Sequence, residues 1–226
     1  MAADPQPLLS TETPPPPPPP APKPESGKQA LRENIVTIAL ALLLAFGLRT
    51  FVAEARWIPS DSMLPTLAEG DRLVVEKLSY RFGDPQRGDI VVFNPPAQLN
   101  FNGAYIKRLV GLPGDRIQVQ PGVGLFINGV LVDEPYIQDA PAYTLQTLKD
   151  IGTSCGLPSP DGDPDAAIVV PANTYFLMGD NRNNSQDSHC WGFLPKDNII
   201  GRTLFRWWPL NRLKHFGLVE YSELPK

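Results

Sequence analysis

The sequence Y-I-K-R-L-V, residues 105–110, indicates the fold class most directly. Side chains of a β-strand alternate between the two faces of a sheet. The odd-numbered residues, Lys107 among them, therefore share one face with apolar neighbours. The even-numbered residues face the other way, and we expect Arg108 to pair with a carboxylate there.

Seven further runs of this kind follow residue 71, each rich in Val, Ile, Leu or Phe and bounded by Gly, Pro or Asp. Such runs are typical of strands. Helical periodicity is nearly absent after residue 60, so the sequence predicts a mainly β fold built on an antiparallel β-sheet. Asn128-Gly129 additionally predicts a hairpin turn within residues 125–132. The seven runs are residues 72–77, 89–93, 116–119, 124–128, 167–170, 174–178 and 201–207.

An apolar segment, Ile35–Val52, precedes these runs and is interrupted only by Arg49. A bilayer span needs about 20 apolar residues, and the long arginine side chain can reach the interface. The sequence predicts one N-terminal transmembrane helix over residues 34–54.

Two other interpretations of this segment stay open. A buried helix of a soluble protein would rarely be apolar on every face. A secretory signal peptide would explain the small-x-small sequence Ala53-Glu54-Ala55 that follows, but the 34 residues before Ile35 are long for the start of such a peptide. We therefore favour an uncleaved anchor.

The N-terminal tail, residues 1–33, contains seven consecutive prolines, Pro14–Pro20. A proline run is extended and donates no backbone hydrogen bonds, which predicts a disordered spacer or a ligand for a proline-binding partner. Positive charges flank the apolar segment on both sides, so charge alone leaves its orientation open.

The overall composition limits the possible partners. A chain of 226 residues supports one well-filled core, and its formal net charge of −4 makes nucleic acid an unexpected partner. Cys155 and Cys190 form no C-x-x-C motif, and nothing in their spacing requires a disulfide. The two histidines, His189 and His215, do not form a two-histidine zinc motif, so we expect no metal or cofactor.

Two serines, Ser60 and Ser62, lie on the proline-bracketed sequence I-P-S-D-S-M-L-P-T-L, residues 58–67. A serine hydroxyl needs a base to become a nucleophile. His189, beside Asp187, is one candidate, although neighbouring residues point in different directions and show no triad geometry. Lys107 is the other candidate, if burial lowers the pKa of its amine.

Two polar segments complete the chain. Residues 178–192 are rich in Asn, Asp and Ser between apolar sequences, which predicts a loop held by side-chain hydrogen bonds that shape a site. Residues 138–166, rich in Pro, Gly and Asp, predict a polar surface insertion.

Four blocks in this order resemble the bacterial type I signal peptidases, or leader peptidases, which are membrane-anchored serine endopeptidases with a Ser–Lys dyad. The resemblance covers the apolar segment and nearly all of residues 56–210. The blocks are S-x-S-M-x-P-T-L at residues 60–67, R-G-D-I-V-V-F at 87–93, Y-I-K-R-L-V-G-L-P-G-D at 105–115 and G-D-N-R-x-N-S-x-D-S at 179–188.

The resemblance implies a role for seven residues. Ser62 matches the nucleophile and Lys107 the general base. The supporting positions are Ser60 in the oxyanion hole, Ser185 orienting the lysine amine, and Asp180, Arg182 and Asp187 as structural braces of the site.

The resemblance also implies substrates and a location. The substrates would be signal peptides of exported preproteins, cut after Ala-x-Ala or similar small residues. The tail would lie inside, with residues 55–226 outside as a β-rich peptidase domain, in contact with the lipid bilayer and transiently with the export machinery. The membrane would be the bacterial plasma membrane or an internal photosynthetic membrane.

Two features depart from the family pattern. His189 stands where many members have arginine, a form similar to members from photosynthetic lineages, so a pH-dependent contact of His189 with Asp187 is expected instead. The proline tract is no part of the pattern.

Two other functions stay open. One is a membrane-tethered, non-catalytic β module that binds extended peptides. The other is a self-cleaving Ser–Lys peptidase of the repressor type, although this chain has no segment for a nucleic-acid-binding domain.

Overall fold

The computed structural model describes residues 27–96, 103–145 and 167–216. The chain divides into two compact units, residues 1–43 and 44–226. The proline tract and most of the polar segment, residues 146–166, lie outside the described residues.

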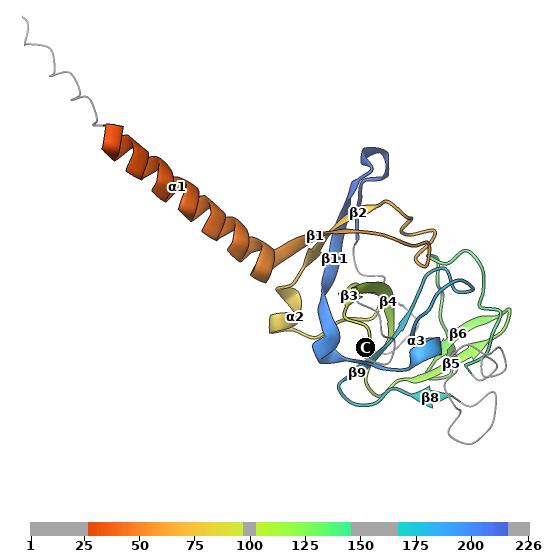
Figure 1. Ribbon diagram of the computed structural model, residues 1–226. Helices are drawn as coiled ribbons and strands as arrows, with labels where there is room; N and C mark the ends of the chain where they lie inside the picture. Colours follow the sequence, from red (N-terminus) through yellow and green to blue (C-terminus); the bar gives the residue numbers. More distant parts are fainter. Residues whose placement is uncertain (1–26, 97–102, 146–166, 217–226) are drawn as a thin grey trace, which may run out of the picture. The chain divides into compact units, whose positions relative to one another are not determined.

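The first feature of the described chain is a long apolar helix, α1 (Gly27–Gly47), which continues into a π-helical turn, η1 (Leu48–Val52) (Figure 1). Leu and Ala dominate its sequence, and both favour helix. Residues Ala30–Val52 are long and apolar enough to cross a bilayer, and none of this span is buried within the protein.

The second unit is mainly β, and every strand pair among its described residues is antiparallel. The predicted fold class is therefore confirmed. Its larger sheet has the order β1-β2-β11-β3-β4-β9-β10, with β12 also pairing with β11. These strands are β1 (Ala53–Trp57), β2 (Arg72–Glu76), β3 (Ile90–Phe93), β4 (Tyr105–Gly111), β9 (Thr174–Met178), β10 (Leu194–Pro195), β11 (Ile199–Trp208) and β12 (Lys214–His215).

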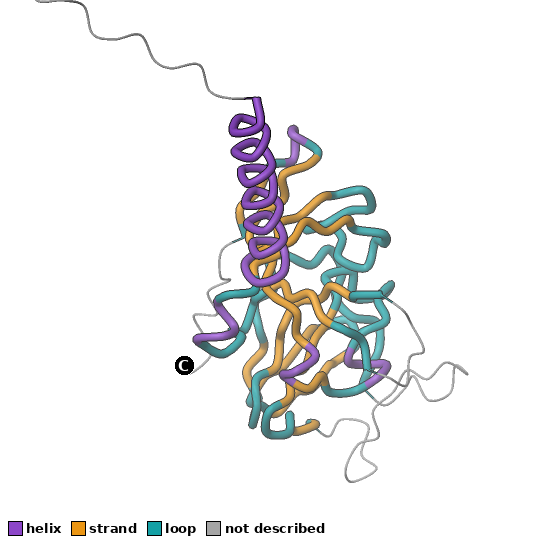
Figure 2. Tube along the Cα trace, turned by 60° about the vertical axis from the view of Figure 1, so that its left-hand side comes forward, coloured by secondary structure: helices purple, strands orange, loops and turns teal. Residues whose placement is uncertain are grey.

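A smaller sheet has the order β7-β6-β5-β8. Figure 1 shows β5, β6 and β8 together at one end of the unit, away from β1 and β2, and Figure 2 shows the strands in orange. The predicted hairpin is present, because Asn128 and Gly129 both have positive φ, 55° and 82°, as a type I′ turn requires. The strands are β5 (Arg116–Gln120), β6 (Gly124–Ile127), β7 (Val130–Leu131) and β8 (Ile168–Val169).

All eight predicted runs contain a strand, whereas β1, β10 and β12 were not predicted. The sequence of β1, A-E-A-R-W, has low intrinsic β propensity in its first four residues. Its pairing with β2 over five residue pairs decides its conformation.

The long strand β11 joins the two halves of the larger sheet by pairing with both β2 and β3. Its register shifts at three places, and such bulges bend a strand. A Cβ at Gly201 would lie 2.2 Å from the carbonyl oxygen of Glu76, so only glycine permits this close approach to β2.

Strand β4 lies at the centre of the core, since six of its seven residues are buried. One apolar cluster packs Ile106 with β2, β3 and the segment 58–67. A second packs Val110 against the smaller sheet, and a third packs Leu109 against β3 and β9. The side chains of β4 are therefore fixed on both faces of the sheet.

In the part of the chain that the structure describes, four short helical turns lie between the strands. Asp187 caps the third α-helix, because its carboxylate accepts a hydrogen bond from the amide of His189. The turns are α2 (Ser79–Phe82), α3 (Ser188–Trp191), η4 (Lys196–Asn198) and η5 (Leu210–Arg212).

Candidate active site

The serine segment between β1 and β2 is anchored by its apolar residues. Met63 and Leu67 are completely buried, and each such side chain contributes about 1.5–3 kcal/mol on burial. The backbone of Ile58 exchanges hydrogen bonds with Asp71 and Gly70 at the base of the loop, both 2.9 Å. Ser62 is thereby held half-buried, whereas Ser60 stays exposed.

Strand β4 brings Lys107 to this loop. Its Nζ donates hydrogen bonds to Ser62 Oγ at 2.7 Å and to the carbonyl of Ile106 at 2.9 Å. Lys107 is only 5% exposed. The two residues are 45 positions apart in sequence, and the structure brings them into direct contact.

Burial lowers the pKa of Lys107 to about 8, although the negative charges of Asp187 and Asp180 act in the opposite direction. An ordinary lysine, with a pKa of about 10.4, would be almost entirely protonated at neutral pH. The buried amine can instead lose its proton near physiological pH and then accept one from the serine hydroxyl.

The other hydroxyls predicted for the site occupy different surroundings. Ser60 Oγ lies 3.3 Å from Ser62 Oγ. Ser185 Oγ is buried on the side of Asp187, where it helps to lower the pKa of that carboxyl. No hydrogen bond joins Ser185 to Lys107 in the described part of the chain. Its role as the group that orients the lysine stays a prediction.

The turn that follows β9 holds the serine segment in place through hydrogen bonds. Asn181 donates its backbone amide to the carbonyl of Ser62 and its side-chain amide to that of Asp61, both 3.1 Å. A Cβ at Gly179 would lie 2.4 Å from the carbonyl oxygen of Ser62 and 2.3 Å from Ser185 Oγ. Sequence reasoning missed this role of Gly179, although a glycine directly after an apolar strand is a signal of close backbone approach.

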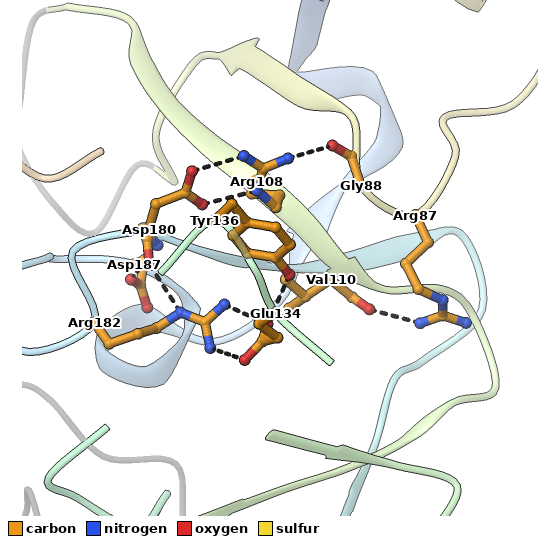
Figure 3. A network of polar contacts seen from close by, with 10 residues as sticks. Arg87, Gly88, Arg108, Val110, Glu134, Tyr136, Asp180, Arg182 and Asp187 are labelled. Atoms are coloured by element: carbon orange, nitrogen blue, oxygen red, sulfur yellow. Dashed lines mark hydrogen bonds and ion pairs between the residues drawn. The ribbon is translucent and has the colours of Figure 1, made fainter. Parts of the chain in front are cut away.

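Arg108 projects to the opposite face and pairs with Asp180, as expected for a carboxylate partner. Its Nε and second terminal nitrogen donate to the two carboxylate oxygens at 2.8 and 2.7 Å (Figure 3). The remaining terminal nitrogen donates to the carbonyl of Gly88 at 2.9 Å. This pair fixes the turn after β9 to β4, next to Lys107.

A second buried guanidinium braces the same turn. Arg182 pairs with Glu134 at 2.6 and 2.5 Å and donates its Nε to the carbonyl of Gly179 at 3.0 Å. Tyr136 donates its hydroxyl to Glu134, and its ring lies 3.9 Å from Cζ of Arg108 (Figure 3). Sequence reasoning missed Glu134 and Tyr136, which precede the polar insertion and carry no local signal of burial.

Asp187 is fully buried and fixes the C-terminal part of the loop 179–189. One carboxylate oxygen accepts the amide of Gly179 at 2.7 Å, and the other lies 2.5 Å from Nδ1 of His189. Burial opposes the charge of Asp187, yet the contacts with His189 and Gly179 hold its pKa below the ordinary value. Within the described part of the chain the hydrogen-bond partners of the His189 ring are Asp187 and Cys190, and no hydrogen bond joins His189 to Ser62.

The cysteines and potential metal ligands are the remaining candidate groups. Cys190 is disulfide-bonded, and Cys155, the other cysteine of the sequence, lies outside the described residues. The described residues contain no cluster of three or more His, Cys, Asp or Glu side chains that could hold a metal ion.

A cavity of about 430 Å³ opens at the dyad. Ser62 and Lys107 form part of its wall, with Ser60 beside them. Pro59, Ala104 and Ile106 supply apolar lining, so an extended apolar peptide could reach the serine hydroxyl.

A protein family described as "Signal peptidase, peptidase S26" matches residues 31–208 of this chain. The match includes most of α1 and contains both Ser62 and Lys107.

Individual relatives agree with this match. "Signal peptidase I" of Leptolyngbya laminosa is 49% identical over 192 residues, which are 83% of this chain and 84% of that protein. "Probable signal peptidase I-2" of Synechocystis sp. is 48% identical, over 78% of this chain and 73% of the other. "Signal peptidase IB" of Staphylococcus aureus is 35% identical, over 83% and 95%. A crystal structure of a signal peptidase I from Enterococcus faecalis V583 matches 53% of this chain and 97% of its own, with 30% identity and a TM-score of 0.38.

Proposed function

The chain belongs to the signal peptidase family, peptidase S26, and from this premise we propose that Ser62 and Lys107 perform its peptide cleavage. The family membership makes it a membrane-anchored serine endopeptidase whose substrates are the signal peptides of preproteins. The observation that carries the assignment of residues is the 2.7 Å contact between Lys107 Nζ and Ser62 Oγ.

The first step is attack of Ser62 Oγ on the carbonyl carbon of the last residue of the signal peptide. Neutral Lys107 accepts the hydroxyl proton, and the protonated amine then passes it to the leaving nitrogen. An acyl-enzyme forms on Ser62, and water releases the signal peptide with Lys107 again acting as base. The lowered pKa of Lys107 supports this cycle.

The negative oxygen that develops during attack needs hydrogen-bond donors. We assign this role to the backbone amide of Ser62 and the hydroxyl of Ser60, which lies 3.3 Å from Ser62 Oγ. Ser185 is assigned the orientation of the lysine amine in the substrate complex. The ion pairs of Asp180 and Arg182, and the contacts of Asp187, act as braces of the loop.

We infer the location from the anchor together with the orientation that the family resemblance implies. Of the predicted anchor, residues 34–54, the part up to Val52 crosses the membrane, because Ala53 already begins β1. Residues 1–33 form a tail on the inner side, and residues 55–226 lie on the outer side. Signal peptides emerge there a few residues beyond their own apolar span, which suits a serine placed soon after the anchor. The membrane is the bacterial plasma membrane or an internal photosynthetic membrane, and the domain contacts its lipids and, transiently, the export machinery.

The deciding experiment incubates the purified full chain in detergent with a preprotein that carries an Ala-x-Ala site. Wild type is expected to release a signal peptide that ends at the small residue, whereas Ser62→Ala and Lys107→Ala are expected to release none. Mass determination of the substrate fragments identifies the cut. Peptide capture without hydrolysis by wild type would favour a non-catalytic binding module instead.

A further inference from the structure

The aromatic ring of Tyr143 stacks on His189 at the edge of the proposed site. The ring centroids are 4.4 Å apart and the planes differ by 22°. Both residues are buried, at 8% and 5% exposure. Tyr143 belongs to the segment 138–145, which approaches the loop 179–189 from a distant part of the sequence.

The same segment is pinned to the loop by a second residue. Asn183 accepts the amide of Ala142 at 2.8 Å and donates its own side-chain amide to the carbonyl of Ala140 at 3.1 Å. The stack and the two hydrogen bonds together hold residues 140–143 against the loop. The ring of Tyr143 therefore has a fixed position from which it limits the movement of His189.

His189 in turn contacts Asp187, through both its ring and its backbone amide, at 2.5 and 3.2 Å. Asp187 accepts the amide of Gly179, and Gly179 lies directly under the carbonyl of Ser62. A continuous path of contacts thus leads from the Tyr143 ring to the nucleophile loop.

We propose that Tyr143 is a positioning residue of the cleavage reaction, acting through His189 on Asp187. The proposal rests on the function assigned above to Ser62 and Lys107. The stack holds His189 against the carboxylate, and the carboxylate both anchors Gly179 and acts by its charge on the lysine.

The charged groups around His189, Tyr143 and Lys107 determine whether loss of the stack raises or lowers the pKa of Lys107. His189 faces the carboxylate of Asp187, the ring of Tyr143 and the sulfur of Cys190. Burial, followed by the charge of Asp187, raises the pKa of Tyr143, so its hydroxyl stays neutral.

The proposed effect is a change in the protonation of Lys107. It faces the charges of Asp187 and Asp180 and the ring of Tyr105, 5.7 Å from Nζ. If His189 leaves Asp187, the carboxylate loses its compensating donor and stabilises protonated Lys107 more strongly. More of the lysine is then protonated at neutral pH, where it cannot act as a base.

The test compares Tyr143→Leu with Tyr143→Phe in preprotein cleavage across pH. Leucine removes the aromatic stack, so the acidic limb of kcat/KM should move to higher pH, with a loss at pH 7 that largely disappears above pH 9. If the limb moves by about one pH unit, kcat/KM at a fixed pH on that limb falls about tenfold. Phenylalanine keeps the ring and removes only a buried hydroxyl that has no partner among the described residues, so the limb should stay in place.

A second variant tests the path through His189. In Tyr143→Leu/His189→Arg, a permanently charged guanidinium can hold Asp187 without the stack, so the acidic limb should return to the wild-type pH or below it. A structural role alone would lower activity equally at every pH.

An unchanged limb, or a uniform loss, in Tyr143→Leu would overturn the proposal. Failure of the assigned function would look different, because wild type itself would then not cleave, or Lys107→Ala would cleave as well as wild type.

Discussion

Lys107 and Arg108 are neighbours on β4 with opposite electrostatic surroundings. Arg108 makes a two-point ion pair with Asp180, whereas Lys107 forms no ion pair with any described carboxylate and donates to uncharged oxygens. One cation is therefore compensated in the core and the other is not. The uncompensated amine has the lowered pKa that a lysine base requires.

The first prediction concerns pH. Lys107 must be neutral to accept the serine proton, and its pKa is lowered to about 8. The value of kcat/KM should therefore rise with pH up to about 8 and level off above it. Initial rates of preprotein cleavage across pH measure this limb, and a plateau that already begins at pH 6 would contradict the assignment of the base.

The second prediction concerns the identity of the base. Lys107→Arg should abolish cleavage, because a guanidinium keeps its proton and cannot act as a base. Circular dichroism should still show the β fold, which checks that the loss of cleavage does not come from unfolding. Retained processing by this variant would exclude Lys107 as the base.

The third prediction separates the two serines. Ser62→Ala should remove acyl-enzyme formation entirely, whereas Ser60→Ala should slow kcat by about 10²–10³, the usual effect of losing one oxyanion donor. Single-turnover cleavage of a preprotein compares the two. Equal losses would argue against the oxyanion role of Ser60.

The fourth prediction concerns Gly179. Alanine there would bring a methyl group within 2.4 Å of the Ser62 carbonyl, which must move together with the nucleophile. Gly179→Ala should therefore lower kcat severely. Gly83→Ala is the matched control, because its methyl group would make only an ordinary contact, 3.5 Å from the carbonyl oxygen of Ser79. Comparable kcat values for the two variants would show that the close approach at Gly179 is unimportant.

The fifth prediction concerns stability. Arg108→Met leaves Asp180 buried without its partner, which typically costs about 3–5 kcal/mol. Arg108→Met/Asp180→Leu should unfold at a higher temperature than the single variant, because no charge is then left unpaired. Lys196→Met, which breaks an exposed pair with Asp84, should change little. Thermal unfolding of the full chain in detergent, followed by circular dichroism, ranks the variants. An Arg108→Met melting temperature equal to that of wild type would contradict the role of the pair.

Much of the fold was predictable because the local sequence of most strands favours the strand conformation by itself. Runs such as residues 90–93, four buried apolar residues, favour a strand whatever surrounds them. The Asn128-Gly129 turn is similarly local. Strand β1 was not predictable, because Ala, Glu and Arg favour no strand and only the partner β2 imposes the extended conformation.

The site was predictable only in part. Local sequence offered two serines and two candidate bases, and the family resemblance selected Lys107 from them. The braces from Glu134 and Tyr136 could not be found, because Glu134 meets Arg182 across 48 residues of sequence. Tyr143 was likewise hidden in a segment that looked like polar surface, yet it lies in the core cluster of the smaller sheet.

The pairing of β1 with β2 affects whether one copy of the enzyme can cleave another. Ala53-Glu54-Ala55 follows the apolar span as a cleavage site follows the apolar part of a signal peptide. The chain therefore contains a sequence that resembles the cleavage site of its own substrates. In the fold these three residues pair with Glu76, Val75 and Val74, and the side chain of Glu54 is held by Lys77 at 2.7 Å. A second enzyme molecule could cut after Ala55 only once this strand had peeled away from its neighbour. We therefore expect the chain to resist cleavage at this sequence by another copy for as long as β1 stays paired with β2.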